Sequence, residues 1–214
     1  MSDPSVIIMS VFVLLIIGGL GLAIRQGIRE RQQVAEYSAA HGWTVSVKPD
    51  EQLTRLLAAF DPASDSFPRN VMIVERSPSP VYFFRYTRRP KDRPSKDSNG
   101  FGCFTRSGGM RFDGRVEIFN RTPGVEKLID DLAKVGSEEF QEAFTVTENV
   151  PGTAVRIVSH ELEKVMMSHS SGPGWYVNVE IANGAILVSS SWTQSKEEWD
   201  YLIDLTKRIR GAVR

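Results

Sequence analysis

The sequence contains few residues whose type and spacing could do chemistry, and the histidines are the first of these. His160-Glu161 resembles the start of a zinc-protease motif, which requires a second histidine one helical turn further on. That position is Lys164, whose ammonium group cannot bind zinc until it loses a proton. His169 falls on the far side of a helix or beyond its end. With three histidines and one cysteine in the whole chain, the sequence predicts no metal site and no cofactor.

The other reactive groups are better explained by structure than by catalysis. Gly100-x-Gly102 and Gly108-Gly109 precede strand-like runs and are followed by no Lys-Ser/Thr pair, so we interpret them as turn glycines rather than phosphate loops. Cys103 lies in an apolar run without a basic neighbour that would lower its pKa, which is typical of a buried thiol. No serine-hydrolase, Ser-x-x-Lys or kinase signature is present. The sequence therefore predicts no catalytic residue.

One segment stands out by its charge. Residues 85–96 contain a single acidic residue, Asp92, and six basic ones: Arg85, Arg88, Arg89, Lys91, Arg93 and Lys96. A basic loop beside an anionic lipid surface would gain about 1 kcal/mol per charge that reaches it. The favoured interpretation is a solvated loop over residues 88–100, with contact to a lipid headgroup or a partner as the alternative. The chain as a whole carries 26 basic and 26 acidic residues, and this zero net charge disfavours nucleic acid as a partner.

The N-terminal segment predicts a membrane anchor. Residues 6–24 are uncharged and rich in Val, Ile and Leu, and a helix of that length covers about 28 Å, enough for the hydrocarbon core. The tail 1–5 has no Lys or Arg, which argues against a cleaved signal peptide. Arg25, Arg29 and Arg31 follow the segment, so the remaining domain is expected in the cytoplasm. This pattern predicts a single-pass protein of the inner membrane with the bilayer as a partner of residues 6–24.

The anchor is expected to continue as a helical stalk over residues 25–41. Ile24, Ile28, Ala35 and Ala39 fall on one face of that stalk. This face would pack either on the chain's own domain or on a second copy, and both alternatives remain open.

The rest of the chain, residues 42–214, predicts a mixed α+β domain. Strand, helix and hairpin occur in that order twice, which suggests two halves, 43–122 and 123–214, and an amphipathic helix closes the chain. Asn183-Gly184 is the strongest hairpin signal, because both residues accept positive φ. The expected strands cover 43–48, 71–76, 81–87, 101–106, 110–120, 145–147, 176–181 and 185–190. Asp50 is expected to cap the first helix of the domain, and a loop rich in Asp, Ser and Pro follows it over residues 61–68. The other expected helices cover 125–135, 138–144, a segment starting near Ser159, and 196–213. The expected core comprises Trp43, Leu56, Phe83, Phe140, Phe144, Tyr176, Leu187, Trp199 and Leu202.

Two short patterns also resemble a known family. A juxtamembrane helix that runs into His41-Gly42-Trp43, followed by the aromatic strand 81–87, is similar to uncharacterised bacterial membrane-anchored proteins. The C-terminal module, with Glu139-Phe140 and Phe144-Thr145-Val146 before a helix, a hairpin and a final helix, resembles theirs as well. The chain lacks the glycine that often follows the strand at residues 70–74 in that family. The resemblance implies a single N-terminal transmembrane helix with an α+β domain, and no established activity.

We therefore predict a membrane-tethered, non-enzymatic interaction or scaffolding domain with a protein partner or a second copy of itself. Two alternatives remain. One is an enzyme or small-ligand-binding domain of unrecognised type, whose site is assembled from residues distant in sequence. The other is a sensor of anionic lipid headgroups that uses residues 85–96.

Overall fold

The computed structural model describes residues 4–46, 50–76, 79–92, 98–108, 113–124, 129, 131–170, 176–191 and 195–213, without the side chains of residues 4–16, 23, 26 and 170. The chain divides into two compact units, Met1–Val45 and Ser46–Arg214. Each unit is described by itself below.

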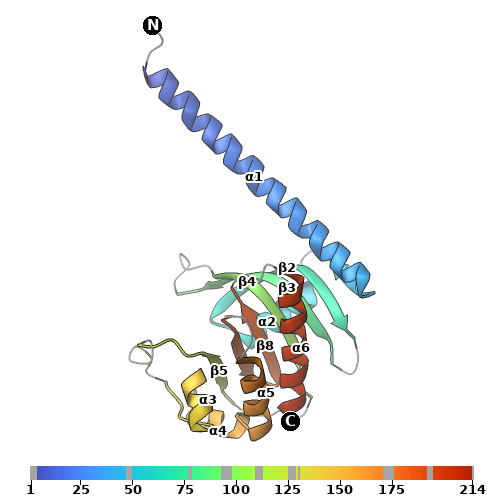
Figure 1. Cartoon of the computed structure of the whole chain (residues 1–214), viewed down its shortest axis with the longest axis vertical. Coiled ribbons are helices and arrows are strands. Elements are labelled where there is room, and N and C mark those ends of the chain that lie inside the picture. The colour runs from blue at the N-terminus through green and yellow to red at the C-terminus, as the bar shows by residue number, and fades with distance from the viewer. Residues whose placement is uncertain are drawn as a thin grey trace. The chain divides into compact units, whose positions relative to one another are not determined.

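The first unit is built on one long helix, α1 (Pro4–Ala40), shown in Figure 1. Among the residues that the structure describes, no helix combines the length and the apolar character that crossing a membrane requires. This finding contradicts the predicted transmembrane segment 6–24, and with it the predicted single-pass inner-membrane localisation.

Helix α1 ends in a small aromatic cluster. Gly42 takes positive φ (67°), which glycine adopts without strain, and its N–H donates to the carbonyl of Ala39. The chain then turns so that the Trp43 ring stacks on His41 at 4.5 Å and meets Tyr37 edge-on at 5.5 Å. Trp43 is half-buried, less than predicted. Strand β1 (Thr44–Ser46) follows.

Within the second unit, the described strands form one antiparallel sheet in the order β2-β3-β4-β8-β7-β5-β6. The strands within the second unit are β2 (Ser64–Glu75), β3 (Val81–Pro90), β4 (Ser98–Arg106), β5 (Arg115–Asn120), β6 (Phe144–Glu148), β7 (Asn178–Ala182) and β8 (Ala185–Ser190). The hairpin β7–β8, formed last along the chain, lies between β4 and β5. It thereby joins the predicted halves 43–122 and 123–214 in one sheet.

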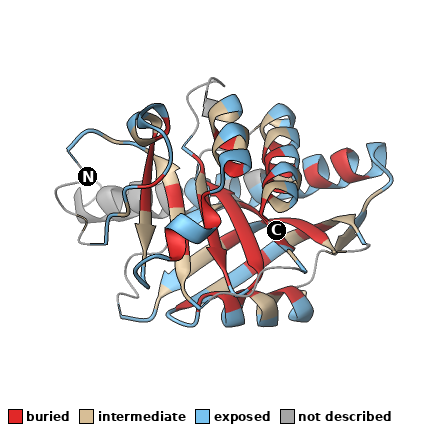
Figure 2. Ribbon diagram, turned by 90° about the horizontal axis from the view of Figure 1, so that it is seen from below, coloured by how far each residue is buried: buried red, intermediate tan, exposed pale blue. Residues whose placement is uncertain are grey.

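Helices cover both faces of this sheet. Helix α2 (Glu51–Phe60) begins at Asp50, whose carboxylate accepts the N–H of Leu53 at 2.8 Å, as predicted. The other helices are α3 (Glu138–Ala143), α4 (Thr153–Ile157), α5 (His160–Ser170) and α6 (Lys196–Ala212). The sheet's central strands are largely buried beneath them (Figure 2). The α+β class predicted from the sequence is thus correct.

Side chains alternate between the two faces of the sheet and build two cores. On one face, Leu53, Leu57 and Phe60 of α2 pack in a cluster with Phe84 and Phe104. On the other face, Trp199 of α6 lies 5.6 Å from the rings of both Phe83 and Phe101. The predicted core residues buried in the structure are Phe83, Phe140, Phe144, Leu187, Trp199 and Leu202. Leu56 is half-buried. The prediction that Tyr176 belongs to the core is wrong, since this residue precedes β7 and is 55% exposed.

Several predicted loops are strands instead. The β2–β3 ladder extends to the pair Ser64↔Pro90, so the predicted loops 61–68 and 88–100 begin or end inside strands. Gly100 and Gly102 lie within β4 rather than in turns. A Cβ on Gly100 would come within 2.5 Å of the Ser190 carbonyl oxygen, so the position requires glycine for close approach of β8 rather than for a turn.

The predicted helix 125–135 is also wrong where the structure describes it. Residues 131–135 are not helical, and Leu132 forms a bridge with Thr147 on β6. The N–H of Ala133 donates to the carbonyl of Val146 at 3.0 Å. This segment covers the outer edge of β6, so tertiary pairing overrides the helical spacing of its apolar residues. The short helix α4 was not predicted.

Candidate functional site

The distal half of the β2–β3 ribbon, where Ser64–Arg69 of β2 pair with Arg85–Pro90 of β3, presents two chemically different faces. Along β3, Tyr86 and Arg88 point to the face that α2 covers, whereas Arg85 and Arg89 are exposed on the opposite face. This follows from the two-residue period of a strand. The predicted basic segment is therefore split between a buried network and an exposed surface.

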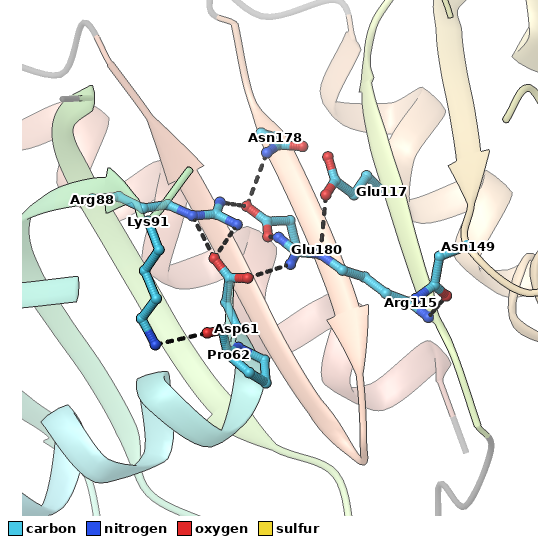
Figure 3. Close-up of polar contacts among 9 residues, drawn as sticks. All are labelled: Asp61, Pro62, Arg88, Lys91, Arg115, Glu117, Asn149, Asn178 and Glu180. Atoms are coloured by element: carbon cyan, nitrogen blue, oxygen red, sulfur yellow. Dashed lines mark hydrogen bonds and ion pairs between the residues drawn. The ribbon is translucent and has the colours of Figure 1, made fainter. Parts of the chain in front are cut away.

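The buried network joins two arginines to two carboxylates (Figure 3). Arg88 donates from Nε to Asp61 at 2.8 Å and from Nη1 to Glu180 at 2.7 Å. Arg115 donates from Nη1 to the other Asp61 oxygen at 3.0 Å and from Nη2 to the second Glu180 oxygen. Each carboxylate thus bridges both guanidinium groups, and the formal charges cancel within the network.

Three separate elements of the sheet and one helix end position these groups. Asp61 caps the C-terminus of α2, where its N–H donates to the Leu57 carbonyl at 2.9 Å. Arg88 lies on β3, Glu180 on β7 and Arg115 on β5. Strands β4 and β8 separate β3 from β7, and on this face they present small residues, Gly100, Gly102 and Ser189. The side chain of Arg88 reaches Glu180 across these small residues.

Burial and charge act in opposite directions on Asp61. Burial alone would raise the pKa of this carboxyl, but the hydrogen bond from Ser64 and the positive charges of Arg88 and Arg115 outweigh it, so the pKa lies below its ordinary value. Glu180 is fully buried in the same network. The guanidinium groups of Arg88 and Arg115 therefore favour the ionised form of Asp61. The four side chains bind one another between α2 and the sheet.

Two further polar groups surround the network. Glu117 forms an ion pair with Nε of Arg115 at 3.0 Å, and it is the cross-strand neighbour of Glu180. The amide nitrogen of Asn178 donates to Glu180 at 3.0 Å. The guanidinium of Arg115 also lies 5.6 Å from the centre of the Phe60 ring, a cation–π distance. These contacts hold the network between α2 and the sheet.

The opposite side of the ribbon is an exposed surface that we call the ribbon face. It comprises Asp65, Phe67, Arg69, Arg85, Thr87 and Arg89, which alternate along β2 and β3. Phe67 is 44% exposed, and the guanidinium of Arg89 lies 5.9 Å from its ring centre. Arg69 and Arg85 stand directly opposite one another in the ladder, so two like charges face each other across the strands.

The structure separates the six basic residues singled out by the sequence. Arg85 and Arg89 lie on the ribbon face, and Arg88 belongs to the buried network. Lys91 lies just past β3, where its ammonium donates to the Pro62 carbonyl at 2.9 Å. Arg93 and Lys96 lie outside the described residues. The four described residues therefore do not share one loop surface.

The other residues considered in the sequence, Cys103 and the histidines, contact only other parts of the fold where the structure describes them. Cys103 is fully buried, and burial raises the pKa of its thiol to about 12, so it is not a nucleophile. Nδ1 of His169 lies 2.8 Å from the Val165 carbonyl of its own helix, and its Nε2 lies 3.6 Å from Asp204. Within the described part of the chain, no group of three or more histidines, cysteines or carboxylates could hold a metal ion.

Sequence reasoning missed Asp61, Arg115, Glu180 and Phe67. Glu180 carried a usable signal, because it lies between Val179 and Ile181 in a strand-like segment, and a carboxylate buried there requires a cationic partner. Nothing in the sequence indicated which arginines would meet it, since they are 65 and 92 residues away. The position of Phe67 on a strand was not predicted, because residues 61–68 were interpreted as a loop.

The comparisons with known proteins bear on the fold. No protein-family model and no curated protein matches this sequence. The resemblance to uncharacterised bacterial proteins is not tested by this result and stays a prediction. Among solved structures, the chain is similar to the mycobacterial trehalose monomycolate transport factor A, TtfA, with a TM-score of 0.56 and 12% sequence identity over 86% of this chain and 94% of that one. At this identity the similarity establishes a shared fold.

Proposed function

We propose that this chain is a non-enzymatic interaction domain that binds a protein partner through the ribbon face and acts as a scaffold. The observation that carries the proposal is Phe67, a large aromatic side chain 44% exposed among three exposed arginines on a paired strand. Aromatic residues and arginine are the residue types enriched in protein interfaces. A position held by two paired strands is also more rigid than a loop.

The buried network is compatible with this proposal, because its two arginines and two carboxylates bind one another. The solved protein with a similar fold, TtfA, is a transport factor, and that name describes no chemical reaction. The alternatives of an unrecognised enzyme and a headgroup sensor stay predictions, because no described contact favours either.

Site-specific photo-crosslinking in cells tests this proposal. A photo-reactive amino acid replaces Thr87, at the centre of the ribbon face, in the full-length chain. The matched control places the same amino acid at Arg55, an exposed position on α2, which covers the opposite face of the sheet. We expect a discrete protein adduct from position 87 that is absent from position 55 and lost when Phe67→Ser is added. Identical adducts from both positions, or none from position 87, would overturn the proposal.

A further inference from the structure

The ribbon face has a defined chemistry that indicates what binds it. We infer that its ligand is a short acidic peptide segment in which carboxylates flank one hydrophobic side chain. This inference rests on the proposed function, because it names the partner of the same surface. It follows from three features of the face: the spacing of its arginines, the position of its aromatic ring, and the one carboxylate it contains.

The arginines are placed for separate carboxylates. Arg85 and Arg89 are four residues apart on β3, and a strand rises about 3.3 Å per residue, so their Cα atoms lie about 13 Å apart. Arg69 stands opposite Arg85, at the Cα separation of about 4.5–5.5 Å typical of paired residues. The face therefore has a pair of guanidinium groups at one end and a single one at the other. Guanidinium groups bind carboxylates in a planar, two-bond geometry.

The facing pair Arg69 and Arg85 is itself an argument for a bound anion. Like charges directly opposite in a ladder repel one another, and a ligand carboxylate placed beside both would be attracted by both. Arg85 and Arg89 are also engaged by other groups of the chain, so a ligand would share those contacts or replace them.

The aromatic ring supplies the hydrophobic part of the site. Phe67 pairs with Thr87 in the ladder and lies between the two ends of the arginine array. Its ring already carries the Arg89 guanidinium on one side, at 5.9 Å from the ring centre. A hydrophobic side chain of the ligand can cover the rest of the exposed ring, and this burial adds to the charge attraction.

Asp65 favours a peptide over a nucleic acid. It is the cross-strand neighbour of Arg89 and is exposed on the same face. A continuous row of phosphates would pass this carboxylate and be repelled, whereas a peptide presents its carboxylates at discrete positions and can place a neutral or basic residue there. The zero net charge of the chain supports the same choice.

Fluorescence anisotropy with defined probes tests the inference on the purified full-length chain. The main probe is a labelled heptapeptide with Asp and Glu on both sides of one Phe. The comparison probes are the same peptide with Asn and Gln in place of the acids, the same peptide with Ser in place of Phe, and a single-stranded DNA oligonucleotide. The acidic peptide with Phe should bind more tightly than all three. Its affinity should fall with added salt, because the Debye length shrinks from about 10 Å at 0.1 M to about 3 Å at 1 M.

Variants locate the binding. Arg85→Ser with Arg89→Ser should weaken the acidic peptide by about tenfold, a change that corresponds to the loss of two modest ion pairs. Phe67→Ser should abolish the preference for the peptide that contains Phe. Arg55→Ser removes one exposed positive charge from the other side of the sheet and should leave binding unchanged.

The outcomes distinguish a failure of the acidic-peptide inference from a failure of the proposed interaction function. Equal binding of the acidic and neutral peptides, tighter binding of DNA, or an effect of Arg55→Ser equal to that of the ribbon variants would overturn the acidic-peptide inference. If the Thr87 crosslink is nevertheless found in cells, the proposed interaction function stands and its partner has a different chemistry. If position 87 gives no crosslink in a chain that keeps Phe67, the proposed function itself is overturned.

Discussion

Glu180→Gln is the sharpest test of the buried network. The substitution keeps the size of the side chain and removes the charge that both Arg88 and Arg115 contact. Glutamine retains one carbonyl acceptor, but its NH2 group must then face a guanidinium group or the Asn178 amide, which are also donors. The two arginines would be left with Asp61 as their shared buried carboxylate.

The expected cost follows from the contacts. Glu180 is fully buried and accepts one charged hydrogen bond from each arginine. Each such bond contributes about 1.5–3 kcal/mol, and breaking a buried ion pair by removing one partner costs about 3–5 kcal/mol. We therefore expect Glu180→Gln to lower the free energy of unfolding by about 3–5 kcal/mol, a large share of the total for a domain.

Glu117→Gln is the matched control. Glu117 is the cross-strand neighbour of Glu180 and forms an ion pair with the same arginine, but its side chain is 35% exposed. Water screens such a pair, so its loss should cost about 1 kcal/mol or less. Urea unfolding followed by circular dichroism measures both variants, and with a slope of about 2 kcal/mol per M the midpoint should fall by about 1.5–2.5 M for Glu180→Gln. Equal small shifts in the two variants would refute our account of the network.

Three further predictions concern other parts of the second unit. The folded pKa of Asp61 lies below its unfolded value, so its ionised form stabilises the fold above the unfolded pKa and this stabilisation is lost as the pH falls through the folded pKa. The melting temperature of the wild type should therefore fall more between about pH 6 and pH 3 than that of Asp61→Asn, and parallel curves would contradict this. Cys103 should resist alkylation in the native protein and react in urea, whereas rapid native labelling would show that it is accessible. Gly100→Ala should destabilise the fold by about 1–3 kcal/mol in a urea titration because its Cβ would meet the Ser190 carbonyl, while Gly211→Ala, with open space around it in α6, should be neutral or slightly stabilising.

The sequence predicted correctly the elements that are determined by residues close to one another in the chain. Asp50 caps α2, and Asn183-Gly184 makes the hairpin turn, both as predicted. Each of these depends on residues within four positions of one another. The apolar face of α6 was identified for the same reason, since its period is visible within a single helix.

The errors have non-local causes. Residues 61–68 contain Pro and Ser and have the composition of a loop, yet Ser64 and the residues after it pair with β3 because a partner strand is available. The charge of Arg88 was assigned to solvent, because its carboxylate partners lie 27 and 92 residues away in sequence. The N-terminal apolar run was interpreted by its composition, and the helix that contains it does not meet the requirements of a membrane span within its described part.

The position of the β7–β8 hairpin has a consequence for synthesis of the chain on the ribosome. Strands β4 and β5 are synthesised before the hairpin. They are not neighbours in the finished sheet, because β8 and β7 lie between them. Until residues 178–190 have been made, both strands therefore have an open edge that can pair with another nascent chain. The network is incomplete for the same interval, since Glu180 belongs to that hairpin. Fragments that end before residue 178 are expected to aggregate rather than fold, and their yield as soluble protein in a cell-free translation series should rise only after the hairpin has been made.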